Sequence, residues 1–112
     1  MKDERERNRR PVHPGEQLRE HVLPSLKLSQ TEFARRLGVS RLTVSELLLE
    51  KRAMSADMAV RVARLTNTTP DGWLHMQVAV DLWELKKDQN RYRKIEPVVA
   101  RRQRPAATTG SP

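Results

Sequence analysis

The sequence predicts a single all-α domain with five short helices. Apolar residues recur at helical spacing along much of the chain, and Pro, Gly, Ser and Thr separate these periodic segments. No segment shows the alternation expected of a strand, and there is no internal repeat. With 112 residues, of which 4% are aromatic, the chain has room for one core built mainly from aliphatic side chains.

The first predicted helix opens after the pair Pro14-Gly15 and carries Leu18 and Val22 four residues apart, on one face. Pro24 has no amide hydrogen, and it also disfavours a helical conformation in the residue before it. We therefore expect a short helix that ends near Leu23.

The second predicted helix has a well-marked start and stop. Its opening sequence, Ser29-Gln30-Thr31-Glu32, is a capping box in which the Ser29 hydroxyl and the Glu32 carboxylate should each bind an otherwise unpaired amide. The residues expected to face the core are Phe33, Ala34 and Leu37. Gly38 suits the left-handed turn that ends this helix, since glycine adopts that conformation without steric cost.

The third predicted helix follows at once, with Ser40 as its N-cap. Its apolar residues have the spacing of one helix face and are expected to pack on the core; they are Val44, Leu47 and Leu48. The residues then left facing outward at its amino-terminal end are Arg41, Thr43 and Ser45. This outward face is polar, and two of its three side chains are short.

The last two predicted helices also have recognisable ends. Ser55 caps a fourth helix that runs to about Thr66, and Asn67 suits a left-handed stop. Its residues expected to face the core are Ala59, Val62 and Ala63. The sequence Thr69-Pro70-Asp71 begins the fifth helix with a cap, a proline in the first turn and an acid that the helix dipole favours.

The fifth helix carries apolar residues on two nearly opposite faces. One face holds Trp73, Met76, Val80 and Trp83, and the other holds Leu74, Val78, Leu82 and Leu85. The polar seam between them consists of Gln77, Asp81, Glu84 and Asp88. A monomer of this size can cover one apolar face, so the other predicts a homodimer formed through this helix. In the alternative interpretation, the helix is wedged wholly inside one domain.

The formal charge of +8 suggests a polyanionic partner, but it is unevenly distributed. Residues 1–10 carry a net charge of +2, residues 11–90 carry +1 and residues 91–112 carry +5. Neither end has the apolar periodicity that a packed core requires. We therefore expect a flexible charged tail over 1–10, a folded DNA-binding and dimerisation domain over 11–90, and a basic, disordered tail over 91–112.

The DNA-binding prediction comes from the second and third helices, which match a helix-turn-helix. The second helix of such a unit, here called the reading helix, enters a major groove about 12 Å wide. Arg41 can bind guanine with two hydrogen bonds, whereas Thr43 and Ser45 can bond a base edge or contact a thymine methyl. On an isolated helix these residues would usually form only a solvated surface. The ordered series of caps, core residues and glycine turn favours DNA binding.

Residues expected to hold the DNA backbone lie on both sides of the turn. Gln30 is at the start of the second helix, where the first amides favour a phosphate. Lys51 and Arg52 follow the reading helix and would add electrostatic attraction without sequence information. The partner predicted from these patterns is double-stranded DNA.

The segment LSQTEFARRLGVSRLTVSELL, residues 28–48, closely resembles the helix-turn-helix of the lambda-repressor-like (XRE) family. Its surroundings resemble the HigA-type antitoxins of bacterial toxin-antitoxin pairs. The supporting segments are HPGEQLREHVLP, residues 13–24, and MSADMAVRVARLTNTTPDGWLHMQVAVDL, residues 54–82. Together the resemblance covers about residues 12–88, most of the part expected to fold.

The resemblance implies a five-helix fold, a dimer formed by the carboxy-terminal part, repression of the protein's own operon, and neutralisation of a small ribosome-dependent mRNA-cleaving toxin. It places base reading on Arg41, Thr43 and Ser45, and it places Gln30, Ser40 and the segment after the reading helix near phosphates. Two features depart from the family. Leu49 stands where many relatives have a polar residue, and it should either pack on the fourth helix or lose a backbone contact. The basic tail after Glu96 is not part of the motif.

A stand-alone helix-turn-helix repressor with no toxin partner is the alternative function. Gene context separates the two, because an antitoxin is expected beside a small open reading frame that encodes a compact basic protein. Either protein would place two reading helices in successive major grooves about 34 Å apart, so the operator should be an inverted repeat.

Other classes of function are disfavoured by composition. Cysteine is absent, which excludes disulfides, iron-sulfur clusters and thiolate zinc sites. His13, His21 and His75 are scattered and no catalytic pair or triad is marked, so we expect no enzyme activity, metal or cofactor. No apolar run approaches the roughly 18 to 20 residues that cross a bilayer, and the charged start is unlike a secretory signal. A cytoplasmic protein without a membrane partner is expected.

Overall fold

The computed structural model describes residues 9–99, and all regular structure in this range is helical. The predicted all-α, five-helix class is confirmed for this part of the chain. The first helical unit comprises α2 (Pro14–Gln17), η1 (Leu18–Val22) and α3 (Leu23–Leu26); the others are α4 (Gln30–Leu37), α5 (Arg41–Leu48), α6 (Ala56–Thr66) and α7 (Pro70–Lys86). A short 3-10 turn, η2 (Gln89–Tyr92), follows α7. Most of the two predicted tails lies outside the described residues. No helix between residues 9 and 99 is long and apolar enough to span a membrane.

The first helical unit extends to Leu26, so the predicted end near Leu23 is wrong. Its middle segment η1 is a π-helix, in which the amide of Leu23 donates to the carbonyl of Leu18, five residues earlier. This wider turn lies directly before Pro24 and accommodates a ring that would collide with a carbonyl in a regular α-helix. The unit ends at Lys27, whose φ of 58° is left-handed.

Helices α4 and α5 form the predicted helix-turn-helix pair. Ser29 caps α4 by accepting a hydrogen bond from the amide of Glu32 at 3.1 Å. The carboxylate of Glu32 does not return to the cap, however, but binds Arg35 and Arg36. Half of the expected capping box is therefore missing, because two arginines one turn along the helix compete for the carboxylate. Gly38 ends α4 with a left-handed φ of 76°, as predicted.

The predicted ends of α6 and α7 are also present. The Ser55 hydroxyl accepts a hydrogen bond from an amide of the first turn of α6, and Asn67 ends that helix with a left-handed φ of 57°. The Thr69 hydroxyl accepts from the amide of Gly72 at 3.3 Å, and Pro70 occupies the first turn of α7. Local side-chain chemistry therefore defines where these two helices begin.

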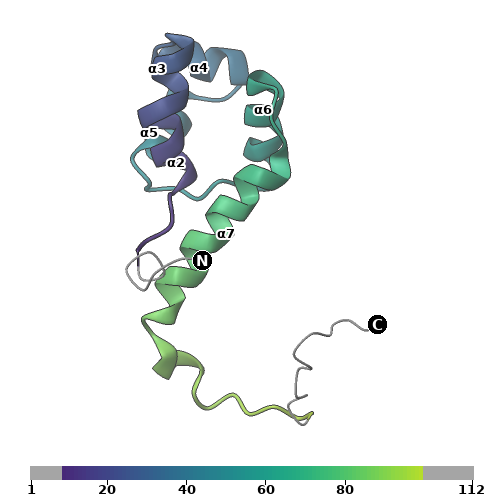
Figure 1. Ribbon diagram of the computed structural model, residues 1–112. Coiled ribbons are helices and arrows are strands. Elements are labelled where there is room, and N and C mark those ends of the chain that lie inside the picture. Colours follow the sequence, from purple (N-terminus) through teal and green to yellow (C-terminus); the bar gives the residue numbers. More distant parts are fainter. Residues whose placement is uncertain (1–8, 100–112) are drawn as a thin grey trace.

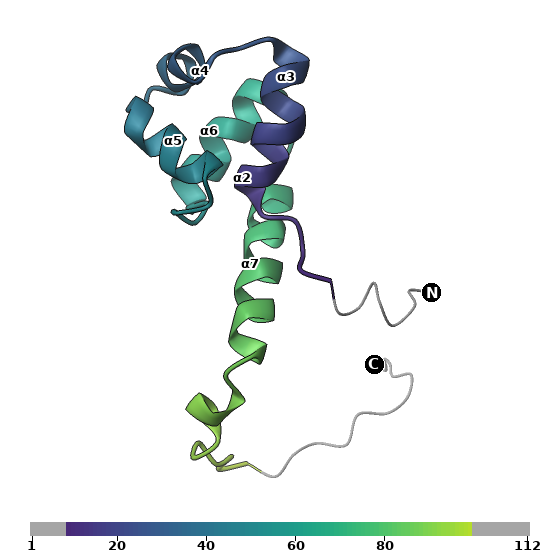
Figure 2. The same cartoon turned by 90° about the vertical axis from the view of Figure 1, so that its left-hand side faces the viewer.

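Helices α2 to α6 pack into one compact group, from which α7 extends (Figure 1). The core lies inside this group, and its buried residues are Leu18, Leu23, Phe33, Ala34, Leu37, Val44, Leu47, Leu48, Met54, Met58, Ala59, Val62, Ala63 and Trp73. The later turns of α7 project beyond the group, and η2 follows at their far end (Figure 2). The α4–α5 pair and the end of α7 therefore lie at opposite ends of the molecule.

Candidate nucleic-acid interface

The turn between α4 and α5 is closed by hydrogen bonds from two directions. The amides of Gly38 and Val39 both donate to the carbonyl of Ala34, at 2.9 and 3.1 Å. From α6, Nη1 of Arg61 donates to the carbonyl of Leu37 at 2.8 Å. The last carbonyls of α4 are thus satisfied by the turn and by a cation, which suits the negative end of the helix dipole. The start of α5 is consequently held at a fixed position relative to α4.

The amino-terminal end of α5 presents the three predicted base-reading residues. Arg41 is exposed, and Thr43 and Ser45 are half-buried. The Ser40 hydroxyl accepts from the amide of Thr43 at 3.0 Å and lies 2.9 Å from the Thr43 hydroxyl. This contact orients the Thr43 side chain and leaves its hydroxyl further hydrogen-bonding capacity. A long cation beside two short hydroxyls matches the donors and acceptors of a major groove.

Leu42 belongs to the same exposed surface, although it is not among the predicted DNA-contacting residues. Its side chain is 66% exposed, in contrast to the buried residues Val44, Leu47 and Leu48 of the same helix. An exposed leucine beside base-reading positions can contact a thymine methyl. A signal was present in the sequence, because Leu42 does not fit the apolar spacing of the core-facing residues. Leu49, which was expected to pack on α6 or to lose a backbone contact, is exposed.

The two cations after α5 differ in their present partners. Nη2 of Arg52 lies 2.7 Å from Oε1 of Glu46, so a phosphate would have to displace that carboxylate. Lys51 is exposed and has no ion pair within residues 9–99. Lys51 is therefore better placed than Arg52 to add net attraction toward a phosphate.

At the start of α4, Gln30 is half-buried in the first turn, and Ser40 is exposed across the α4–α5 turn. Hydrogen bonds from Arg35 and Arg36 lower the pKa of Glu32 to about 2. This carboxylate is therefore ionised at neutral pH, and the group of three side chains has a net charge of +1. The surface beside the reading helix remains favourable to an anion.

Packing distinguishes the two apolar faces of α7. Val80 is 3% exposed, Trp73 is buried and Met76 packs against the core, so this face is turned inward. Val78 is 50% exposed on the other face, and Leu82 and Leu85 are exposed with it. The remaining two residues of the predicted faces are intermediate: Leu74 packs against the core, and Trp83 is half-buried with the Lys87 ammonium 4.1 Å from its ring centre. The exposed face of α7, defined as Val78, Leu82 and Leu85, is the one available to a partner.

The histidines lie apart from the α4–α5 surface. His13 is buried and caps α2, its Nδ1 accepting from the amide of Gly15 at 2.8 Å, and burial lowers its pKa. His21 and His75 are exposed. Among residues 9–99, no three His, Asp or Glu side chains converge into a group that could hold a metal ion.

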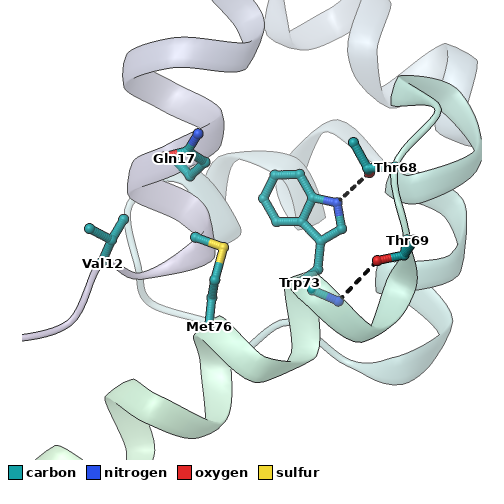
Figure 3. A pocket seen from close by; sticks show the side chains of 7 residues that line it. Val12, Gln17, Thr68, Thr69, Trp73 and Met76 are labelled. Carbon is teal, nitrogen blue, oxygen red and sulfur yellow. Dashed lines mark hydrogen bonds between the residues drawn. The ribbon is translucent and has the colours of Figure 1, made fainter.

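An open cavity of about 460 Å³ lies between the first helical unit and the start of α7 (Figure 3). Its lining residues are Val12, Gln17, Thr68, Thr69, Gly72, Trp73 and Met76. The indole nitrogen of Trp73 donates to the hydroxyl of Thr68 at 2.9 Å, so that polar group already has a partner. The cavity contains none of the predicted DNA-contacting residues and is separate from the α4–α5 surface.

Two serine-capped helices joined by a glycine turn, with a polar surface at the start of the second, define a helix-turn-helix protein. The model of the helix-turn-helix family HTH_3 matches residues 17–73. The chain belongs to this family.

Known relatives refine this assignment. Over 93 residues the chain is 40% identical to the uncharacterized HTH-type transcriptional regulator YbaQ of Escherichia coli K12, covering 80% of this chain and 82% of the relative. It is 37% identical over 90 residues to antitoxin HigA-1 of Vibrio cholerae, with coverage of 80% and 82%. The structure of Pseudomonas aeruginosa antitoxin HigA with the higBA promoter superimposes with a TM-score of 0.71 and 36% identity, covering 80% of this chain and 100% of that one. The resemblance to HigA-type antitoxins of the XRE class is thereby confirmed.

Proposed function

We propose that this chain is the antitoxin of a type II toxin-antitoxin pair, which binds an inverted-repeat operator as a homodimer, represses its own operon and neutralises a small mRNA-cleaving toxin. The carrying observation is the exposed start of α5, where Arg41 and Leu42 project beside the half-buried Thr43 and Ser45. The relatives named HigA, one of them solved with promoter DNA, support the same role. The activity is binding, with no catalytic step.

In the proposed complex, the start of α5 lies in the major groove. Arg41 donates two hydrogen bonds to guanine, and Leu42 contacts a thymine methyl beside it. Thr43 and Ser45 bond neighbouring base edges. The phosphates on either side are held by Gln30, Ser40, Lys51 and Arg52, which position the helix without reading sequence.

The proposed homodimer forms through the exposed face of α7. Val78, Leu82 and Leu85 are exposed and share one side of this helix, and a second copy would remove all three from water. A two-fold axis through this contact relates two reading helices, which an inverted repeat requires. Because the same face is present on both subunits, the contact would cover apolar surface on each of them.

The specific observation favouring a stand-alone repressor is the similarity to YbaQ, which is described only as a transcriptional regulator. Both functions use the same α4–α5 surface, so DNA binding does not separate them. Toxin neutralisation does, because it requires a second macromolecular partner encoded next to the antitoxin gene.

The deciding experiment is co-expression of the tagged full chain with each adjacent open reading frame, followed by affinity capture and mass spectrometry. Each reading frame is also induced alone, to establish whether it arrests growth and whether this chain relieves the arrest. Stoichiometric capture of a neighbour whose toxicity is relieved supports the antitoxin. If neither neighbour is captured or toxic while the chain still shifts its own promoter DNA, the stand-alone repressor is the function.

A further inference from the structure

Gln77 is a buried polar side chain that connects two parts of the molecule. Its spacing in the sequence predicts a place in the polar seam of α7, but it is 6% exposed. Its Oε1 accepts a hydrogen bond from the amide of Met54 at 2.8 Å, and its Nε2 donates to Oδ1 of Asp81 at 3.0 Å. Because a carboxylate only accepts hydrogen bonds, Asp81 orients the amide so that its oxygen faces Met54.

The bond joins the segment after the reading helix to α7. Met54 lies between α5 and α6, and its side chain is buried in the core. The same segment carries Lys51 and Arg52, which we propose to bind phosphates. Val78, the residue after Gln77, belongs to the exposed face of α7. A single turn of α7 therefore holds the DNA-binding part on one side and presents the proposed dimer contact on the other.

Other contacts at this junction constrain its geometry less. Arg10 lies 2.9 Å from Glu50, which follows α5, and 3.5 Å from Glu84 on α7, but all three side chains are partly exposed. Water screens such pairs, and their long side chains can rearrange at little cost. A buried hydrogen bond to a backbone amide has a narrow range of distances and angles, and leaving it unmade is costly. Among the polar contacts at this junction, the bond between Gln77 and Met54 is therefore the one that most narrowly constrains the position of α7 relative to the segment after α5.

We propose that Gln77 is a positioning residue that fixes the orientation of the reading helix relative to α7 and thereby sets the half-site spacing accepted by the dimer. This inference rests on the proposed dimeric binding of DNA. One added base pair moves a half-site by about 3.4 Å and rotates it by about 35° around the duplex. A rigid junction rejects that change. A loosened junction lets each reading helix adapt, so spacing discrimination falls although each half-site is still read.

Three variants test the role of this bond. Gln77→Met removes both hydrogen bonds while keeping a side chain of similar length. Gln77→Glu combined with Asp81→Asn exchanges donor and acceptor, so that the carboxylate accepts from the Met54 amide and from the introduced asparagine amide. Val62→Ala is the matched control, because it shortens a fully buried side chain of α6 and lowers stability without removing either bond.

The measurement is the affinity of each full-length protein for the operator footprinted in its own promoter. Derivatives with the half-sites moved by one or two base pairs, and an isolated half-site, are measured alongside. For the wild type we expect a one-base-pair shift to cost about tenfold in affinity, similar to one mismatched pair. Gln77→Met should reduce that loss to about threefold or less, with half-site affinity within about twofold of wild type. The double variant should restore the wild-type discrimination, and Val62→Ala should retain it.

The inference is overturned if Gln77→Met discriminates spacing as the wild type does, or if Val62→Ala loses discrimination equally. If the wild type binds the full operator no more tightly than the isolated half-site, the proposed dimeric binding fails and the inference fails with it. If it binds the full operator more tightly but shows no preferred spacing, the inference alone is overturned. Should Gln77→Met not fold, Asp81→Ala releases the orientation of the amide from an exposed position. That variant is then expected to show a smaller but measurable loss of discrimination, and unchanged discrimination would again overturn the inference.

Discussion

The α4–α5 pair and α7 differ in how much of their apolar surface is buried within one copy of the chain. Each of the paired helices is eight residues long, has a serine N-cap and buries one apolar face in the core. Helix α7 is 17 residues long, buries Trp73, Gln77 and Val80, and exposes Val78 and Leu82 on its other apolar face. The DNA-binding part is therefore complete in a monomer, whereas α7 retains apolar surface that a partner can cover.

This difference separates two kinds of constraint on an amphipathic helix. A short helix with one apolar stripe has a single stable orientation, so its polar surface is fixed by its own sequence. A helix with two apolar stripes can pack on the core through either stripe. Which stripe is buried depends on the elements that the rest of the chain places next to the helix. Substitutions on the two faces of α7 should accordingly have different consequences.

The largest expected effect is that of Val80→Glu. It places a carboxylate at a position that is 3% exposed, and should lower the free energy of unfolding by about 3 to 5 kcal/mol. Val78→Glu is the matched change on the exposed face, and should leave the monomer folded while dissociating the proposed dimer. Chemical denaturation and light scattering measure the two properties. Equal unfolding by both variants would contradict the distinction between the faces.

The next effect concerns Gly15, where the first helical unit meets the end of the reading helix. A Cβ on Gly15 would overlap the backbone carbonyl of Leu47, so Gly15→Ala should lower the free energy of unfolding by about 1 to 3 kcal/mol. In Gly72→Ala, the new Cβ would meet the Thr69 hydroxyl at 3.4 Å, an ordinary contact, and alanine favours the helix. Urea denaturation of both should show destabilisation only for Gly15→Ala. A similar loss in Gly72→Ala would indicate a general intolerance to alanine.

Sequence was sufficient where structure depends on neighbouring residues. The caps at Ser29 and Ser55 and the left-handed stops at Gly38 and Asn67 are local features, and all four were predicted. The outward placement of Arg41 follows from the short helix that carries it.

Sequence was insufficient where the outcome depends on competition or on distant parts of the chain. The first helical unit continues past Pro24 because a π turn relieves the collision between the proline ring and a backbone carbonyl. The Glu32 carboxylate does not complete the capping box because arginines on the same helix bind it. Gln77 is a polar residue of a type usually found at the surface, but it is buried because it binds the amide of Met54, 23 residues away in the sequence. The base-reading and interface residues remain predictions until binding is measured.

Within the α4–α5 surface, two substitutions separate base reading from electrostatic attraction. Arg41→Ala should cost about 1 to 3 kcal/mol on the cognate operator and relax the preference at one base position. Lys51→Ala should weaken binding to all sequences similarly and reduce the slope of log K against log salt by about one. Anisotropy titrations on the operator and on base-substituted derivatives at several salt concentrations measure both. If both variants weakened every DNA equally, the base-reading assignment of Arg41 would be wrong.

The smallest expected effect is a pH dependence at His13, which caps α2 close to the junction of the two regions. Burial is the main cause of its lowered pKa and the Arg10 charge also lowers it, whereas Glu50, Asp81 and Glu16 act in the opposite direction. The unfolded chain, with a histidine pKa of 6.5, therefore binds the proton more tightly than the folded protein. Neutral His13 therefore contributes its full stabilisation of the folded protein above pH 6.5. This stabilisation is lost as the pH falls from 6.5 toward the pKa of His13 in the folded protein.

His13→Asn keeps an oxygen that can accept the Gly15 amide but has no group that titrates in this range. Denaturation at about pH 7.5 and about pH 5 should show a larger loss of stability on acidification for the wild type than for the variant. The effect of Glu32 falls almost entirely below this window, because its pKa is about 2 in the folded protein and 4.5 in the unfolded chain. Identical losses in both proteins would show that other groups carry the acid sensitivity. A loss confined to the wild type would make His13 a proton-sensitive contact at the point where the first helical unit, the reading helix and α7 meet.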